Sequence, residues 1–208
     1  MLKGLDAPSI LRFHDAPLLE AAQGGFAHAG SARVWRAIEA NHRCNWLLWN
    51  EEDKARRTDV GAAAIAASKR LIDRHNQQRN DAVEAIDEAI LDQLGEHDQR
   101  PDARLSSETA GAMIDRLSIL SLKVFHMRAQ TERTDGAADH IDTCNTKLAR
   151  LLVQRHDLVS CLDSLLLDAA AGRAYFKVYR QFKMYNDPTL NPYLYDQNVV
   201  GASQGSAP

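Results

Sequence analysis

Apolar and polar positions recur along most of the chain at the three- and four-residue spacing of α-helices, without the two-residue alternation of strands. The pattern predicts four long helices, at about residues 32–57, 61–94, 106–131 and 137–171. The connections between them are short and contain turn-forming residues, so consecutive helices are expected to pack antiparallel. The predicted fold is therefore all-α, an antiparallel four-helix bundle.

Shorter segments flank this bundle, which we place at residues 31–172. Residues 1–30 form an N-terminal extension whose apolar pieces are expected to make short helical turns. Residues 173–195 begin with a basic and aromatic helix, expected to cover the core, and continue through a proline-containing segment. Residues 196–208 are predicted to be a flexible tail.

Residues suited to capping mark the predicted helix ends. Ser31 precedes the first helix, and Ser106 and Ser107 precede the third. Serine side chains can accept hydrogen bonds from the free amides of a helix start. Gly172 follows the fourth helix, where glycine tolerates the backbone conformation that ends a helix.

Polar side chains occupy core-like positions on the predicted helices. The distance of each residue along its helix from the connecting turn gives its depth in the predicted bundle, with an error of about one helical turn or ~5 Å. At one common depth, polar residues of all four helices are expected to meet. We call this set the polar belt. It consists of His42, Asn45, Trp49, Asp73, Asn76, Asn80, Glu84, Asp115, Ser118 and Arg150.

Three interpretations of the polar belt follow from the cost of burying unpaired polar groups, roughly 1–3 kcal/mol each. The belt forms a closed network that sets helix register, for example through Asp73 with Arg150 or Asp115 with Lys147. Alternatively it binds a ligand or metal, with the surroundings of His42 as the first place to look. In the third interpretation the belt residues of the second predicted helix face water.

Carboxylates support a separate enzymatic hypothesis. Glu84 and Asp87 have the Glu-x-x-Asp spacing of all-α nucleotide pyrophosphohydrolases, and Glu52 and Asp53 lie on the preceding helix. Hard carboxylate ligands suit Mg²⁺, which would bridge a substrate diphosphate. These four residues are the candidate metal ligands of a hydrolase acting on nucleotides or nucleotide sugars. The depth estimate weighs against it, because it separates Glu52 from Glu84.

Composition narrows the classes of function. The chain has 208 residues and a formal net charge of −3, which gives no support for nucleic-acid binding. No apolar run approaches the ~20 residues of a membrane span, and the N-terminus shows no signal-peptide pattern. The three cysteines lack a Cys-x-x-Cys spacing and are expected to be small core residues. We expect a cytoplasmic protein; a homo-oligomer is compatible with the sequence.

Four motifs together resemble a known bacterial family. They are His-x-x-Asn-x-x-x-Trp-x-x-Glu-Asp-x-Ala-Arg ending at Arg56, Asp-x-x-Asn-Gln-x-Arg-Asn-Asp-x-x-Glu-x-x-Asp ending at Asp87, Ser-Glu-Thr-x-Gly-x-x-Ile-Asp-Arg-Leu-Ser-Ile-Leu ending at Leu120, and Lys-Met-Tyr-Asn-Asp-Pro-x-Leu-Asn-Pro ending at Pro192. Over about residues 30–195 the chain is similar to the DUF4254 family, a domain of unknown function.

The resemblance implies a context for the protein. Members of this family look like cytoplasmic helical proteins encoded among genes for cell-envelope polysaccharide and glycosyltransferase enzymes. We therefore expect an accessory of such pathways that binds a polar or phosphorylated ligand in the polar belt, with a glycosyltransferase or a small phosphorylated molecule as partner. An interaction scaffold with a closed polar core is a further alternative.

Overall fold

The structure is a computed structural model that describes residues 2, 4–21, 33–95, 100–181 and 187–195. The chain divides into two compact units, Met1–Val178 and Tyr179–Pro208. The first unit holds the long helices and every site discussed below. The described part of the second contains one short helix, α6 (Pro192–Tyr195). The tail predicted for residues 196–208 lies outside the described residues.

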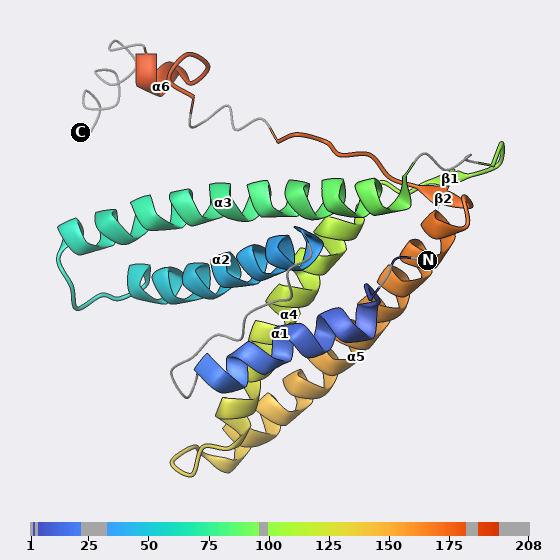
Figure 1. Ribbon diagram of the computed structural model, residues 1–208. Coiled ribbons are helices and arrows are strands. Elements are labelled where there is room, and N and C mark those ends of the chain that lie inside the picture. Colours follow the sequence, from blue (N-terminus) through green and yellow to red (C-terminus); the bar gives the residue numbers. More distant parts are fainter. Residues whose placement is uncertain (1, 3, 22–32, 96–99, 182–186, 196–208) are drawn as a thin grey trace, which may run out of the picture. The chain divides into compact units, whose positions relative to one another are not determined.

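Long helices make up most of the described part of the first unit (Figure 1). They are α1 (Ala7–Ala21), α2 (Arg33–Ala55), α3 (Ala62–Leu94), α4 (Ala110–Thr131) and α5 (Ala138–Ala170). Two short strands, β1 (Arg104–Leu105) and β2 (Ala174–Tyr175), pair in parallel. The all-α class is confirmed, and the four predicted long helices, α2 to α5, form close to their expected bounds.

These four helices form two antiparallel hairpins that cross one another. α2 packs along α3, and α4 packs along α5. Figure 1 shows that the two hairpins run in different directions, so that their turns diverge. The single antiparallel four-helix bundle expected from the sequence is not confirmed, because neighbouring helices run antiparallel only within each hairpin.

α4 is the central helix of the first unit, since it packs against α1, α2, α3 and α5. Its apolar residues occur on nearly every side, as a helix enclosed by four neighbours requires. Ile114 and Leu117 of α4 are fully buried against Ile86 and Ile90 of α3 and Leu162 of α5, within one continuous core. Burial of large aliphatic side chains of this kind contributes roughly 1.5–3 kcal/mol each.

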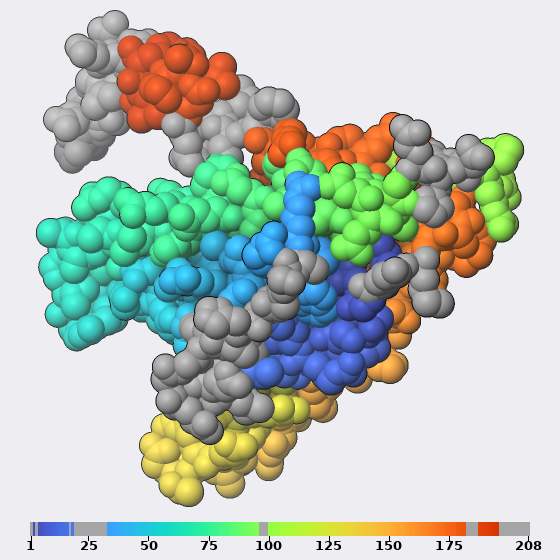
Figure 2. All heavy atoms as spheres, viewed as in Figure 1, coloured from blue at the N-terminus to red at the C-terminus, as the bar shows by residue number. Residues whose placement is uncertain are grey.

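The N-terminal extension differs from its prediction. Instead of short turns it forms α1, a helix of 15 residues. Figure 2 shows α1, in blue, filling the space between the two hairpins on one face of the molecule. Phe13 packs edge-on against Trp35 of α2, and Arg155 of α5 donates to both carboxylate oxygens of Asp15, at 2.8 and 3.1 Å. Contacts to both hairpins therefore stabilise one continuous helix.

The helix expected from residue 173 onward does not form over its described part. Gly172 ends α5 with φ 68°, as predicted, and the chain then enters β2. Residues 176–181 have no regular secondary structure. Pairing with β1 holds this segment extended and places Phe176 in the core with 3% exposure. The segment covers part of the core, as predicted, but it does so as extended chain and not as a helix.

The cap of α4 is also different from the expected one. Thr109 is the N-cap, and its side chain accepts from the amide of Ala112 at 3.1 Å. Ser106 instead donates its hydroxyl to the carbonyl oxygen of Glu108. The predicted cap at Ser31 lies outside the described residues.

Candidate functional site

Part of the predicted polar belt closes on itself at the crossing of α2 and α4. Asp115 Oδ1 accepts from the side-chain amides of Asn41 at 2.8 Å and Asn45 at 2.9 Å. Ser118 Oγ lies 3.0 Å from Asn45 Nδ2 and 2.8 Å from His42 Nδ1. His42 is 1% exposed and Ser118 is 0% exposed. This cluster satisfies most of its polar atoms internally, so its centre is a structural network.

His42 also stacks on His14 of α1, with ring centroids 4.9 Å apart. Both rings are buried, and among the described residues His14 Nδ1, His14 Nε2 and His42 Nε2 have no hydrogen-bond partner. Burial lowers the pKa of His42 to about 4, and burial, His42 and Arg155 together hold the pKa of His14 well below 6.5. Both histidines are therefore neutral near pH 7.

The remaining belt residues of α3 and α5 do not join this network. Asp73 forms an ion pair with Lys69 on the surface, and Arg150 is exposed on α5. The pairing of Asp73 with Arg150 is wrong, and so is that of Asp115 with Lys147. Asn80 is buried and Glu84 is half-buried on α3. The physical reason is the crossing of the hairpins, which removes the common level that a parallel-sided bundle would have.

Three of the four metal candidates, Asp87, Glu52 and Asp53, have other partners. Asp87 Oδ1 accepts from the amide of Gly111 at 2.6 Å, and its pKa is raised to about 6, chiefly by burial. It therefore caps α4 from α3. Glu52 and Asp53 both pair with Arg56, at 3.0 and 3.8 Å. Among the described residues, no group of three or more histidine, cysteine or acidic side chains is placed to hold a metal ion.

Two pockets open where the hairpins diverge, beyond the closed network. The first, which we call the amide pocket, has a volume of about 470 Å³ and lies between α2, α3 and α4. Its polar walls include Asn45, Asn76 and Arg79, and Trp49 and Asp53 stand at its edge. Three residues of the predicted belt thus line an open pocket after all. They do so at the Trp49 end of the belt, on the far side of the network from His42.

The second pocket, which we call the basic pocket, has a volume of about 610 Å³ and lies between α2, α4 and α5. Lys123, Lys147 and Arg150 line it, with Asp53 as its one carboxylate. No described carboxylate lies within ion-pair distance of any of these three cations. In a chain of net charge −3, this is a local concentration of positive charge facing a cavity.

A stacked aromatic pair forms one wall of the basic pocket. The rings of Trp49 and His126 lie 2° from parallel, with centroids 4.4 Å apart. Burial lowers the pKa of His126, while Asp53 raises it to a lesser degree. A neutral imidazole against the indole gives an uncharged, flat wall beside the three cations. This combination suits a ligand that has both an anionic group and a flat ring.

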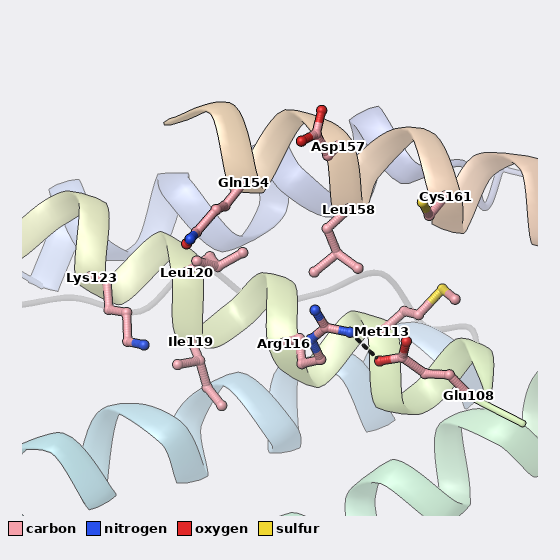
Figure 3. A pocket seen from close by; sticks show the side chains of 10 residues that line it. All are labelled: Glu108, Met113, Arg116, Ile119, Leu120, Lys123, Gln154, Asp157, Leu158 and Cys161. Carbon is pink, nitrogen blue, oxygen red and sulfur yellow. Dashed lines mark hydrogen bonds and ion pairs between the residues drawn. The ribbon is translucent and has the colours of Figure 1, made fainter. Parts of the chain in front are cut away.

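A third groove lies between α4 and α5 (Figure 3). It shares Lys123 and Gln154 with the basic pocket, and Figure 3 shows both side chains at one end of the groove. Met113, Leu120 and Leu158 give it apolar walls, and an ion pair between Arg116 and Glu108 crosses its other end. The basic pocket is therefore the junction of two neighbouring cavities.

Lys123, His126 and Arg79 were missed in the interpretation of the sequence. Lys123 and His126 fall in the most apolar helix, where the apolar pattern indicated burial. A signal was present nonetheless: Lys-x-x-His-x-x-x-Gln over 123–130 and Lys-x-x-Arg-x-x-x-Gln over 147–154 have the same helical spacing. Each places three polar groups on one helix face.

The sequence model of a family described as "Protein of unknown function (DUF4254)" matches residues 35–178. The chain belongs to this family. The match covers α2 to α5 and both strands, and so includes both pockets. No curated protein and no solved structure matches the chain. Across the described residues, none of the helices combines the length and apolar character needed to cross a bilayer.

Proposed function

We propose that this DUF4254 protein binds a phosphorylated small molecule in its basic pocket. The observation that carries the proposal is the set of three cations, Lys123, Lys147 and Arg150, that line one cavity without a described carboxylate partner. Lysine and arginine recognise phosphate through charge-assisted hydrogen bonds, which are roughly twice as strong as neutral ones. The cavity volume of about 610 Å³ falls within the usual range of small-molecule sites.

The finer role that we propose is that of a cytoplasmic accessory in cell-envelope polysaccharide or glycosyltransferase pathways. Its support is the context that the family resemblance implies. Nucleotide sugars and sugar phosphates carry the anionic groups that the basic pocket suits. A glycosyltransferase that receives or releases such a ligand is the partner that this role requires.

Calorimetric titration with inorganic pyrophosphate tests the binding proposal. Wild-type protein is expected to bind, and the double variant Lys147→Gln/Arg150→Gln is expected to bind at least about tenfold more weakly. Lys69→Gln, which removes a surface lysine of α3 from its pair with Asp73, is the matched control and should leave the affinity unchanged. Equal affinity of wild type and double variant would contradict the proposal.

The hydrolase hypothesis predicts a different result with the same protein. Phosphate or pyrophosphate should then be released from nucleotides in the presence of Mg²⁺, and Glu84→Gln should abolish the release. Binding without turnover across a nucleotide panel supports the binding role. The scaffold alternative draws on the closed network of Asp115 and predicts a co-purifying protein with no affinity for pyrophosphate.

A further inference from the structure

We propose that the ligand is a nucleoside phosphate that spans both pockets, with its phosphates in the basic pocket and its base in the amide pocket. This inference rests on the proposed function and names its ligand class. Its starting point is that Trp49 and Asp53 line both pockets. A single molecule can therefore pass from one pocket to the other along these two side chains.

The amide pocket offers the polar groups that can recognise the edge of a base. The Asn45 amide nitrogen donates to the Asp115 carboxylate, which can only accept, so this bond fixes which way the amide faces. Asn45 Oδ1 is then an acceptor held in place at the pocket wall, and no described residue donates to it. The closed network thus orients a recognition group.

Donors stand in the same pocket. Asn76 lines it and has no hydrogen-bond partner among the described residues. Arg79 reaches it from α3 with 29% of its side chain exposed, and its nearest carboxylate contact, to Asp115, is 3.9 Å long. Side-chain amides and guanidinium groups pair with the donor and acceptor edges of bases. A fully ionised phosphate has no donor for the Asn45 carbonyl, whereas the edge of a base offers both donors and acceptors.

The walls of the amide pocket suit the flat faces of a base. Trp49 contributes an indole, and Leu48, Ile119 and Leu122 contribute apolar surface. Bases of every kind stack on aromatic side chains, because each base has a flat π-face. A sugar phosphate without a base would leave this surface uncovered.

Asp53 stands at the boundary of the two pockets. A carboxylate there repels a phosphate but accepts hydrogen bonds from hydroxyl groups. A ribose lies between the base and the phosphates of a nucleotide, and acidic side chains commonly bind its hydroxyls. The amide pocket also contains Glu52 and Arg56, which form an ion pair with each other at 3.0 Å. From the amides of this pocket, past Asp53, to the three cations of the basic pocket, the lining therefore offers successive partners for the base, ribose and phosphates of a ribonucleotide.

Calorimetric titrations with pyrophosphate, ADP, GDP, CDP, UDP and glucose 1-phosphate test this inference. The tightest nucleotide should bind at least about tenfold more tightly than pyrophosphate or the sugar phosphate. Asn76→Ala should remove that advantage and leave pyrophosphate binding unchanged. Gln77→Ala, which removes a surface amide of the same helix, is the control and should preserve the advantage.

Two further readouts bear on the order of groups. Trp fluorescence should be quenched by the nucleotide in wild type but not in Trp49→Phe. Asp53→Asn should reduce the preference for the ribonucleotide over its 2′-deoxy form. Nucleotides that bind no better than pyrophosphate would overturn the inference and leave the proposed function standing. Absence of binding to every probe, pyrophosphate included, would overturn both.

Discussion

Asn45 of α2 donates its side-chain amide to Asp115 of α4 at 2.9 Å, and this bond links the interior of the protein to its candidate site. On the inner side Asp115 also accepts from Asn41, so that two buried amides depend on one carboxylate. On the outer side Asn45 lines the amide pocket. The same contact therefore fixes the crossing of the hairpins and orients a pocket residue.

Substitution of Asp115 tests the structural part of this relationship. Asp115→Ala leaves the Asn41 amide without its acceptor and removes one of the acceptors of Asn45, which keeps Ser118. An unsatisfied buried donor costs about 1–3 kcal/mol, and a lost hydrogen bond to a charged group about 1.5–3 kcal/mol. We expect the free energy of unfolding, measured in urea, to fall by about 2–4 kcal/mol. Asp81→Ala removes an exposed carboxylate of α3 and should change it by less than about 0.5 kcal/mol. Equal effects of the two substitutions would refute the network.

The carboxylate of Asp87 makes the free energy of unfolding depend on pH. Its pKa in the folded state is raised to about 6, from an ordinary value of 3.8, so the folded protein binds the proton more tightly than the unfolded chain. Its contribution to stability is therefore present below pH 3.8 and is lost as the pH rises through 6, by about 3 kcal/mol in total. Asp87→Asn keeps an acceptor for the Gly111 amide and should lack this contribution. Urea unfolding of both proteins between pH 4 and 7 measures the difference.

A second variant at Asp87 separates the effect of its charge from the effect of its hydrogen bond. Asp87→Ala removes the acceptor as well as the charge and should be less stable than Asp87→Asn at every pH, since the Gly111 amide is then unpaired. A stability difference between wild type and Asp87→Asn that does not change with pH would contradict the raised pKa.

Gly111 marks the closest approach of α4 to α3. A Cβ at this position would lie 2.6 Å from the carbonyl oxygen of Val83 and 2.9 Å from Asp87 Cγ. Because a backbone atom cannot move aside, Gly111→Ala should destabilise the protein by roughly 1–3 kcal/mol. Gly61→Ala is the matched control, because its Cβ would meet no atom within 4 Å. Thermal unfolding of the two variants compares them, and the prediction fails if Gly111→Ala melts with wild type.

The stacked histidines of α1 and α2 predict a second pH dependence of stability, opposite in sign to that of Asp87. The pKa of His42 is lowered to about 4, so its contribution is present above pH 6.5 and is lost as the pH falls from 6.5 towards 4. Its full size is about 3 kcal/mol. The groups that face the pair are Ser118 and Arg155. His14→Phe should remove one ionisable ring, and its stability relative to wild type should increase as the pH falls.

Histidine signals in NMR titrations give a direct measurement for the same pair. The His42 ring should remain neutral down to about pH 4. Titration of His42 near pH 6.5 would contradict its enclosure.

The helices α2 to α5 could be predicted because their periodicity is local, and so could the two hairpins, because short connections leave little choice of partner. The crossing of the hairpins could not, since it depends on side chains that meet only after folding. The strand at Ala174 and Tyr175 depends on pairing with Arg104 and Leu105, about 70 residues earlier. Likewise α1 is continuous because both hairpins bury it.

Some residues of the candidate site could be predicted from the sequence, but their arrangement could not. Asn45, Trp49, Asn76 and Arg150 belong to the predicted polar belt, and all four line a pocket. The depth estimate assumed a parallel-sided bundle, and this assumption drew attention to His42. With the hairpins crossed, His42 lies in the enclosed centre, while Lys123 and Lys147 face the open end with Trp49.

The most direct test of the central claim is a titration of isotope-labelled protein with pyrophosphate, followed by NMR. The account predicts that the largest shifts occur at the Trp49 indole, the His126 ring and the amides around Lys123, Lys147 and Arg150. It also predicts that the Lys147→Gln/Arg150→Gln variant loses these shifts. Shifts confined to another surface, or an unchanged response in the variant, would contradict phosphate binding in the basic pocket.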